Sequence, residues 1–436
     1  MKTKRISFLL RTAFVLFFAV SAFSGTWAAE AYIDEKGESM THDAKELKDD
    51  TATPLAAGWY IVKKDVTFNK MINCTETNGD INLILADGAH LTINNSYECL
   101  YVQNGSLNIY RQSGGTGILT VASSGNHGIY ASTNVNIYGG NIQAAGSGDY
   151  FGINAGSSVT IAGGTVSATG NKGIDSGTVT IKGGTVSAYG SSYVGINANT
   201  FSTTAGTITA LVRENTNKKI TLYGRTFIKD GNWNTLCLPF NATTAQLGSS
   251  VTVKELDVTK TSLDANGKLT LRFKDASSIE ACKPYIVKWP SGTNVVNPYF
   301  TGVSGAPSIS DASLQVITSN DGNVKFVGQF SPFAITAENI DEILYIASSN
   351  KIGYSKNARE LKYCGAHFWV QPNKSGSGAR TIDVDFGDGE TISGVTGLTS
   401  ESNDSDGFYY DLQGRRVAQP VQKGLYIVDG HKVLVK

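Results

Sequence analysis

A short repeat in the middle of the chain constrains its fold more than any other feature. Each copy is about 22 residues long, within the range typical of solenoid repeats. The copies share three markers in the same order: a Gly-Ile pair in four copies, and a Val-x-Ile triplet and a hexapeptide such as Gly-Gly-Thr-Val-Ser-Ala in three copies each. The Gly-Ile pair begins at residues 128, 152, 173 and 195. The Val-x-Ile triplet begins at 135, 159 and 179, and the hexapeptide at 163, 183 and 205.

Each repeat contains three short runs in which apolar and polar residues alternate, separated by glycine, asparagine or serine. Alternation with a period of two indicates strands, and the glycines mark corners that need unusual backbone angles. Three strands per copy, repeated in register, predict a parallel β-helix whose coils stack about 4.8 Å apart. Equivalent apolar side chains should then form interior ladders, for example Ile129, Ile153, Ile174 and Ile196. Weaker copies upstream extend the expected solenoid to residues 55–212, with residues 29–54 as an N-terminal lead-in or cap.

The sequence changes character after the solenoid. A charged segment at residues 213–219 ends the repeat, and short alternating runs separated by Asn- and Gly-containing turns follow. Many short strands at irregular spacing predict an antiparallel β-sandwich over residues 213–386. One short helix is expected at 338–344, with Thr336 as its N-cap. The predicted fold class is therefore all-β.

The end of the chain is expected to be a separate small unit. A linker rich in Gly, Ser and Asp is predicted at residues 387–407, followed by a tail at residues 408–436. Within this tail, an apolar run on each side of Asp429-Gly430 predicts a β-hairpin.

The start of the chain predicts export. Residues 1–28 have a basic beginning and an apolar run that ends near small residues, which is the pattern of a secretory signal peptide. The apolar run is shorter than the roughly 20 residues that a membrane-spanning helix needs. We therefore expect a protein that is secreted or displayed on the outer cell surface.

Charge and cysteine content exclude two classes of protein. The chain has 37 basic and 37 acidic residues, and four of the basic residues lie in the predicted signal, so no basic surface for nucleic acid is expected. The five cysteines are an odd number, which argues against a disulfide framework. Cys74 and Cys99 lie about one coil apart, so the sequence is compatible both with a disulfide between them and with two buried thiols.

Outward positions of the repeat supply candidate binding residues. Two pairs of tyrosines are expected to stack on adjacent coils, where their flat faces and polar tips suit sugar rings. The alternative is that these side chains only stabilise the coils. The candidate ligand-binding residues are Tyr101, Tyr110, Tyr130 and Tyr138.

The later coils carry oxygen-bearing side chains at the same outward position. Asn154, Asp175 and Asn197 are candidate metal ligands, and Ca²⁺ is the cofactor that such oxygen ligands would prefer. A hydrogen-bonded ladder without a metal is the alternative.

Catalysis is not expected. A glycosidase needs two carboxyl groups about 5–10 Å apart. The acidic residues between 96 and 210 are Glu98, Asp149 and Asp175. Their spacing does not place two of them on neighbouring coils of one ladder. The favoured function is a non-catalytic carbohydrate-binding protein that uses an exposed face of the β-helix. A structural spacer or protein adhesin is one alternative, and a polysaccharide lyase or glycoside hydrolase is another.

Three regions of the chain, each marked by two or three short stretches, resemble known families. Residues 81–93, with 107–110 and 114–117, resemble a family of bacterial surface β-helix proteins described as carbohydrate-binding domains, over roughly residues 57–210. This resemblance implies calcium-assisted, non-catalytic binding of plant-type polysaccharides or surface glycans. Residues 230–240 and 283–289 resemble a domain common in exported Bacteroidota surface proteins. Residues 410–417 and 423–428 resemble the C-terminal sorting-type tail of such proteins, which implies outer-membrane export machinery as a partner.

Overall fold

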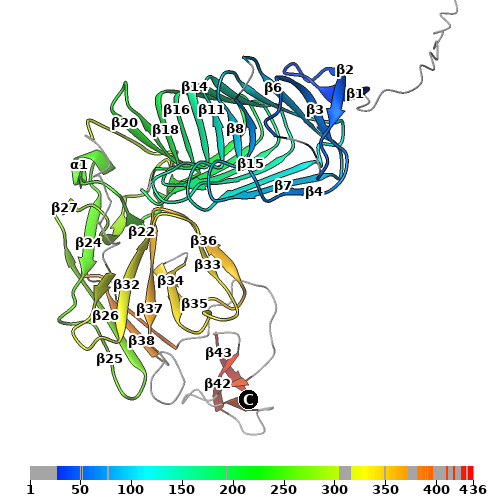
Figure 1. Ribbon diagram of the computed structural model, residues 1–436. Coiled ribbons are helices and arrows are strands. Elements are labelled where there is room, and N and C mark those ends of the chain that lie inside the picture. Colours follow the sequence, from blue (N-terminus) through cyan, green and yellow to red (C-terminus); the bar gives the residue numbers. More distant parts are fainter. Residues whose placement is uncertain are drawn as a thin grey trace, which may run out of the picture.

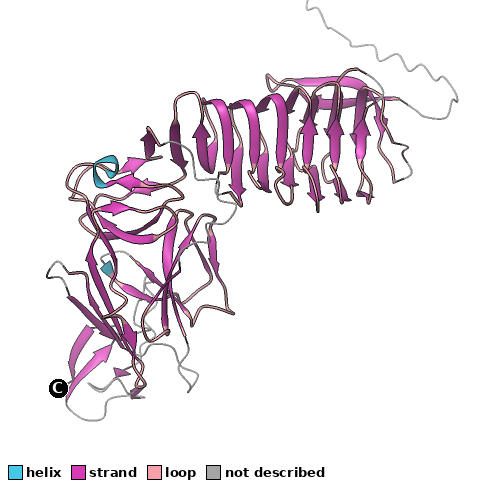
Figure 2. Cartoon of the chain, turned by 60° about the vertical axis from the view of Figure 1, so that its left-hand side comes forward, coloured by secondary structure: helices cyan, strands magenta, loops and turns pink. Residues whose placement is uncertain are grey.

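The protein consists of a parallel β-solenoid followed by antiparallel sheets, as the computed structural model shows (Figures 1 and 2). The expected all-β class is therefore confirmed. Of the predicted signal segment 1–28, only the last two residues are described. The structure describes residues 27–49, 51, 53–75, 78–192, 194–303, 316–347, 350–371, 381–387, 389, 391–395, 409–410, 416–417, 424–428 and 431–435.

The solenoid makes about six turns, each built from three strands that belong to three parallel sheets. Sheet 1 contains β3 (Gly58–Val62), β6 (Ile81–Leu85), β9 (Leu107–Arg111), β12 (Asn134–Ile137) and the second halves of β14 (Ile153–Ile161), β16 (Ile174–Ile181) and β18 (Ile196–Thr203).

Sheet 2 contains β4 (Val66–Phe68), β7 (His90–Asn95), β10 (Ile118–Ser123), β13 (Asn141–Ala145), β15 (Thr165–Gly170), β17 (Thr185–Gly190) and the first half of β19 (Thr207–Glu214). Sheet 3 contains β5 (Ile72–Cys74), β8 (Leu100–Val102), β11 (Ile129–Ala131), the first halves of β14, β16 and β18, and the second half of β19.

The predicted interior ladders form the core of the solenoid. Ile129, Ile153, Ile174 and Ile196 are direct register partners and are fully buried. Full burial of one such side chain stabilises the fold by about 1.5–3 kcal/mol. At the corner before sheet 2, Gly184 has φ +80°, and a Cβ atom there would lie 2.5 Å from the carbonyl oxygen of Gly164. Glycine is therefore required at this corner by both the backbone angle and the close approach of neighbouring coils.

A β-hairpin caps the N-terminal end of the solenoid. Strands β1 (Ala28–Ile33) and β2 (Ser39–Glu46) pair in antiparallel fashion, and the end of β2 then pairs in parallel with β3. Ala44 and Leu47 are buried against the first coil. The expected cap at 29–54 therefore covers the otherwise open end of the solenoid core.

The second domain closes the other end of the solenoid (Figure 1). Strand β19 turns back into β20 (Lys219–Tyr223), which pairs with β30 (Tyr299–Thr301) of the second domain. Val194 and Leu211 of the last coil belong to the hydrophobic cluster of the second domain. The last coil and the second domain thus share a core.

Two main sheets face each other in the second domain. The first contains β22 (Trp233–Cys237), β28 (Pro284–Lys288), β24 (Thr252–Leu256), β26 (Lys268–Asp275), β38 (Thr381–Asp385) and β39 (Thr391–Val395), with β25 (Ser262–Leu263) beside β26. The second contains β31 (Val316–Thr318), β32 (Val324–Gln329), β37 (Gly365–Val370), β34 (Ile343–Ile346) and β35 (Ile352–Tyr354).

These two sheets enclose one hydrophobic core, so the predicted sandwich is present. Phe273 of the first sheet lies edge-on to Phe326 and Phe368 of the second, with ring centroids 6.4 and 6.2 Å apart. The pairing of β26 with β38 is parallel, which is an exception in an otherwise antiparallel sheet. Three small two-stranded sheets complete the domain: β21 (Thr226–Phe227) with β29 (Val295–Val296), β23 (Ala242–Thr243) with β27 (Ser278–Ile279), and β33 (Phe333–Ile335) with β36 (Arg359–Leu361).

The predicted helix at 338–344 is wrong. Residues 337–342 form turns, and Ile343 begins strand β34, where it pairs with Trp369. Sheet pairing and burial of Ile343 outweigh the helical pattern of this segment. Within the part of the chain that the structure describes, the α-helix is α1 (Thr244–Leu247), where the N-cap Thr243 and Gln246 form a reciprocal capping box.

The C-terminal region differs from the sequence prediction in one respect. Strand β39 falls within the predicted linker and pairs with β38, so this part of the segment belongs to the sandwich. In the tail, β42 (Gly424–Val428) and β43 (His431–Val435) form the expected hairpin, and β40 (Tyr409–Tyr410) and β41 (Arg416–Val417) extend it to four strands.

All five cysteines are buried, and none of them forms a disulfide. Cys74 and Cys99 are among the core residues of the solenoid, so the structure shows the buried-thiol alternative. No helix among the described residues has the length and apolar character needed to cross a membrane.

Candidate functional site

The four candidate tyrosines lie on two different sheets and do not form one site. Tyr101 and Tyr130 project from sheet 3, where they are direct register partners in β8 and β11. Tyr110 lies in β9 of sheet 1, and Tyr138 follows β12 of the same sheet. The structure therefore brings them together as two separate pairs.

The first pair is a parallel stack. The rings of Tyr101 and Tyr130 have centroids 5.1 Å apart and an interplanar angle of 19°, and both side chains are partly exposed. Burial raises the pKa of Tyr101, and the nearby Tyr130 and Glu98 raise it further. The Tyr101 phenol is therefore neutral at physiological pH and keeps its proton as a hydrogen-bond donor.

Further aromatic rings extend this stack along the corner that precedes sheet 3. His127 stacks on Tyr130 at 5.9 Å, while Tyr150 and Phe151 each contact His127 at 5.0 Å. The side chain of Tyr150 is 39% exposed. We call the resulting surface the aromatic platform, which consists of Tyr101, His127, Tyr130, Tyr150 and Phe151.

His127 was not among the candidate residues identified from the sequence. The backbone N–H of Phe151 donates to its Nδ1 at 3.0 Å, so the ring carries its proton on Nε2. Burial lowers the pKa of His127, which keeps the ring neutral at physiological pH. One signal was present in the sequence, because His127 directly precedes a Gly-Ile marker, as Phe151 does one coil later.

The outward row of sheet 3 continues beyond the platform as a polar ladder, defined as Asn154, Asp175, Asn197 and Arg213. Lys172 Nζ donates to Asp175 Oδ1 at 2.8 Å. Asn197 Nδ2 donates to the same Asp175 oxygen at 2.6 Å, and Arg213 Nε donates to Asn197 Oδ1 at 2.7 Å. Asp175, Asn197 and Arg213 of the ladder, together with Lys172, therefore form a chain of hydrogen bonds with a cation at each end.

This geometry does not favour the expected calcium site. The oxygens Oδ1 of Asp175 and Asn197 accept hydrogen bonds from the protein's own cationic and amide groups, and Lys172 balances the single carboxylate. Among the described residues, no group of three or more His, Cys, Asp and Glu side chains is placed to hold a metal ion. The hydrogen-bonded alternative accounts for Asp175 and Asn197. Arg213, which lies in the charged segment that ends the repeat, is a further partner in this chain.

The second tyrosine pair belongs to the N-terminal cap. Tyr110 and Tyr138 stack at 4.9 Å, but Tyr110 also stacks on Trp59 at 5.1 Å and meets the edge of Tyr32 at 4.8 Å. Tyr32 lies on β1, so the hairpin covers Tyr110. Burial raises the pKa of Tyr110 far above its ordinary value. Tyr110 therefore joins the hairpin to sheet 1, and its ring face is not open to a ligand.

A shallow groove on sheet 2 was not predicted. Its volume is about 490 Å³, and short polar side chains in successive rows line it, such as the register partners Thr120, Gln143 and Ser167. The alternation of polar and apolar residues in these strands was visible in the sequence. The hollow form of the surface depends on how the coils stack.

The three acidic residues that were considered for catalysis have different surroundings. Asp175 is held by Lys172 and Asn197 in the polar ladder. Asp149 is exposed in the turn before Tyr150, and Glu98 is partly buried just before β8.

Comparison with known proteins found no match: no protein-family model fits the chain, and neither curated proteins nor solved structures show significant similarity to it.

Proposed function

We propose that this protein is a non-catalytic carbohydrate-binding protein and that the aromatic platform is its contact surface. The observation that carries the proposal is the stack of Tyr101 and Tyr130 on adjacent coils, with ring centroids 5.1 Å apart. Flat aromatic faces with polar tips suit sugar rings, which have apolar C–H faces and hydroxyl edges.

The solenoid gives this surface two properties that binding requires. The two tyrosines stand on strands whose opposite faces lie in the core, so their rings are held in place before a ligand arrives. The polar ladder continues the same row and offers amide, carboxylate and guanidinium groups to sugar hydroxyls. An extended polymer lying along the row would meet aromatic rings first and hydrogen-bonding groups beyond them.

The surroundings of the acidic residues support binding without bond cleavage. Glycoside hydrolysis requires one carboxyl group as acid and a second as base or nucleophile. Asp175 is committed to Lys172 and Asn197, whereas Asp149 lies in an exposed turn. Because Lys172 supplies the positive charge beside Asp175, the proposed binding does not require Ca²⁺.

We also propose export to the cell surface or the medium, with the glycan partner outside the cell. This part of the proposal rests on the basic and then apolar beginning of the sequence.

Binding of the mature full chain to a panel of neutral and uronic-acid polysaccharides tests the proposal, with and without a calcium chelator. We expect saturable binding that survives chelation and that falls at least about tenfold in a Tyr101→Ala/Tyr130→Ala variant. Tyr299→Ala is the matched control, because Tyr299 is 62% exposed and lies in the second domain. Unchanged binding in the double variant, or no binding to any polymer, would contradict the proposal and favour the spacer or adhesin alternative.

A further inference from the structure

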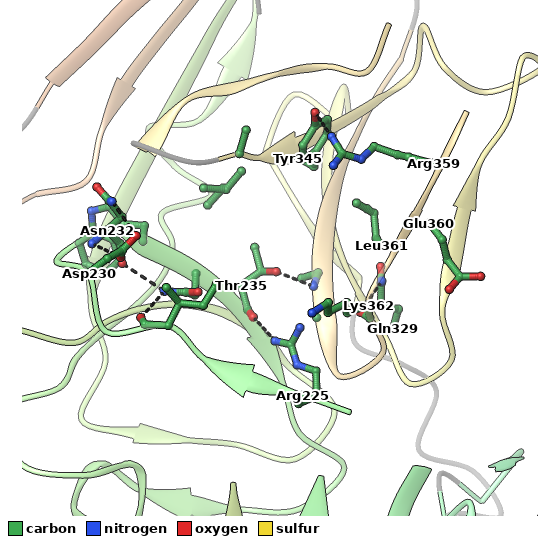
Figure 3. Close-up of a pocket in the computed structure, with 17 residues that line it drawn as sticks. Arg225, Asp230, Asn232, Thr235, Gln329, Tyr345, Arg359, Glu360, Leu361 and Lys362 are labelled. Carbon is green, nitrogen blue, oxygen red and sulfur yellow. Dashed lines mark hydrogen bonds between the residues drawn. The ribbon is translucent and has the colours of Figure 1, made fainter. Parts of the chain in front are cut away.

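The second domain contains a cavity that is separate from the solenoid faces. Its volume is about 390 Å³, which is at the lower end of the range for small-molecule sites. Its walls are formed by the loop before β22, by β22 itself, by the end of β34 and by the segment from β36 to β37 (Figure 3). Trp233 and Thr235 of β22 are among the lining residues, so the cavity is built on a strand of the sandwich.

Arg225 places a half-buried cation at this cavity. Its Nη2 donates to the backbone oxygen of Thr235 at 3.2 Å, whereas its Nε is buried and has no hydrogen-bond partner. Trp233, a second lining residue, likewise has a buried Nε1 without a partner. These are two of the three buried side-chain atoms without a partner among the described residues. Unsatisfied donors of this kind are rare in folded proteins. The indole of Trp233 stacks on Phe386 in the sandwich core, so Arg225 is the one of the two whose charge lies at the cavity wall.

Nothing described near Arg225 supplies a negative charge. No described ion pair includes it, and its neighbours Tyr363 and Cys364 are neutral, because burial raises the pKa of the Cys364 thiol to about 12 and that of Tyr363 well above its ordinary value. Burial lowers the pKa of Arg225, but a guanidinium remains charged at neutral pH.

The acidic residues on the cavity wall are engaged or turned away. Both carboxylate oxygens of Asp230 accept hydrogen bonds from Asn232, each at 2.9 Å. Glu360 points away from the other labelled side chains in Figure 3. Lys362 and Arg359 add two further basic residues to the lining. The wall therefore has more positive than negative charge, and the acids do not neutralise Arg225.

We propose that this cavity binds a small ligand through a carboxylate group, with Arg225 as its counterion. A half-buried cation without a counterion is costly, and a guanidinium matches a carboxylate with two parallel hydrogen bonds. An acidic sugar and a simple organic acid share this group. The proposal does not rest on the function of the aromatic platform, since the cavity lies in the other domain.

Calorimetric titration of the full chain with glucuronate, glucose and lactate tests this proposal. Glucuronate and glucose differ by one carboxylate, so we expect glucuronate to bind at least about tenfold more tightly. Binding of glucuronate alone would identify an acidic sugar as the ligand class, and equal binding of lactate would identify a simple organic acid. Arg225→Gln should weaken either interaction at least about tenfold, whereas Lys325→Gln, which removes a cation outside the cavity, should not.

A second variant covers the case in which Arg225→Gln does not fold. Ala347→Trp adds bulk to the cavity wall and leaves Arg225 in place, so it should also abolish binding. The Tyr101→Ala/Tyr130→Ala variant should retain it, which separates this site from the platform. The proposal would be overturned by equal affinity for glucose, by unchanged affinity in a folded Arg225→Gln protein, or by no binding of either carboxylate at about 10 mM.

Discussion

The single O–H of Tyr363 lies within hydrogen-bond distance of two backbone oxygens, that of Ala210 at 3.0 Å and that of Tyr223 at 2.5 Å. Ala210 and Tyr223 are opposite each other in the β19–β20 pair that ends the solenoid, whereas Tyr363 belongs to the second domain. The one proton of a buried phenol is therefore shared between two carbonyls at the junction of the two domains.

Removal of this hydroxyl should weaken the junction. In Tyr363→Phe the two carbonyls lose a buried donor, which should lower the free energy of unfolding by about 1–2 kcal/mol. Chemical denaturation of the full chain measures the change. Tyr299→Phe, at an exposed position, should have no effect. Equal stability of Tyr363→Phe and the wild type would show that the junction does not depend on this contact.

A buried serine in the solenoid should be a source of instability. Ser176 lies between Ala155 and Ala198 in the sheet 3 stack, and its hydroxyl is buried without a hydrogen-bond partner. Ser176→Ala should therefore raise the free energy of unfolding by about 1 kcal/mol, because the uncompensated desolvation of the hydroxyl is removed.

A matched serine gives the opposite expectation. Ser158 Oγ donates to Asn134 Oδ1 at 2.7 Å, so Ser158→Ala should cost about 1 kcal/mol. Urea denaturation of both variants decides the point. A loss of stability in Ser176→Ala as large as that in Ser158→Ala would mean that the hydroxyl of Ser176 has a partner in solution.

The solenoid was predictable because its information is periodic. The isoleucine ladder that begins at Ile129 occupies the same place in each coil, so spacing alone identified both the strands and their inward faces. The segment at 338–344 has no such repetition. There the local helical pattern competed with a pairing between Ile343 and Trp369, and the sequence does not show which distant strand a short run will join.

The candidate site was predictable only within one row of the repeat. Tyr101 and Tyr130 share a register position and were identified together, whereas His127 joins them from the corner. Tyr110 follows the same logic as Tyr101, but Tyr32 from a hairpin outside the repeat covers it. The role of Arg225 was not predicted from the sequence. It depends on the lack of a counterion among the described residues, and no sequence pattern shows whether a cation is paired in the folded protein.

Acid should destabilise the second domain through His367. This residue is buried, stacks on Phe333 at 4.0 Å, and donates from Nδ1 to Gln329 Oε1 at 2.8 Å. Burial lowers the pKa of His367 to about 4 from its ordinary value of 6.5. The unfolded chain therefore takes up a proton as the pH falls through 6.5, whereas the folded chain does so only near pH 4.

The resulting loss of stability should be about 3 kcal/mol, spread between pH 6.5 and pH 4, with no further contribution from this residue below pH 4. Denaturation midpoints at pH 7 and pH 4.5 measure the slope. His367→Gln should reduce the pH dependence, although it lowers stability overall, and His42→Gln at an exposed position should leave it unchanged. The same slope in His367→Gln and the wild type would assign the acid sensitivity to other groups.

Polysaccharide binding by the aromatic platform should depend on ring faces more than on charge. Tyr130→Phe keeps the stack with Tyr101 and loses one hydroxyl, so we expect the affinity to fall by less than about tenfold. Tyr130→Ala removes the ring and should cost at least about tenfold more than Tyr130→Phe, because the stacking surface is lost. Since burial lowers the pKa of His127 and raises that of Tyr101, both rings stay largely neutral between pH 7.5 and pH 9. Affinity for a neutral polysaccharide, measured by calorimetry, should therefore be constant over this range and insensitive to salt. A tenfold change with pH, or equal affinities of the Phe and Ala variants, would show that the contact is electrostatic or lies on another face.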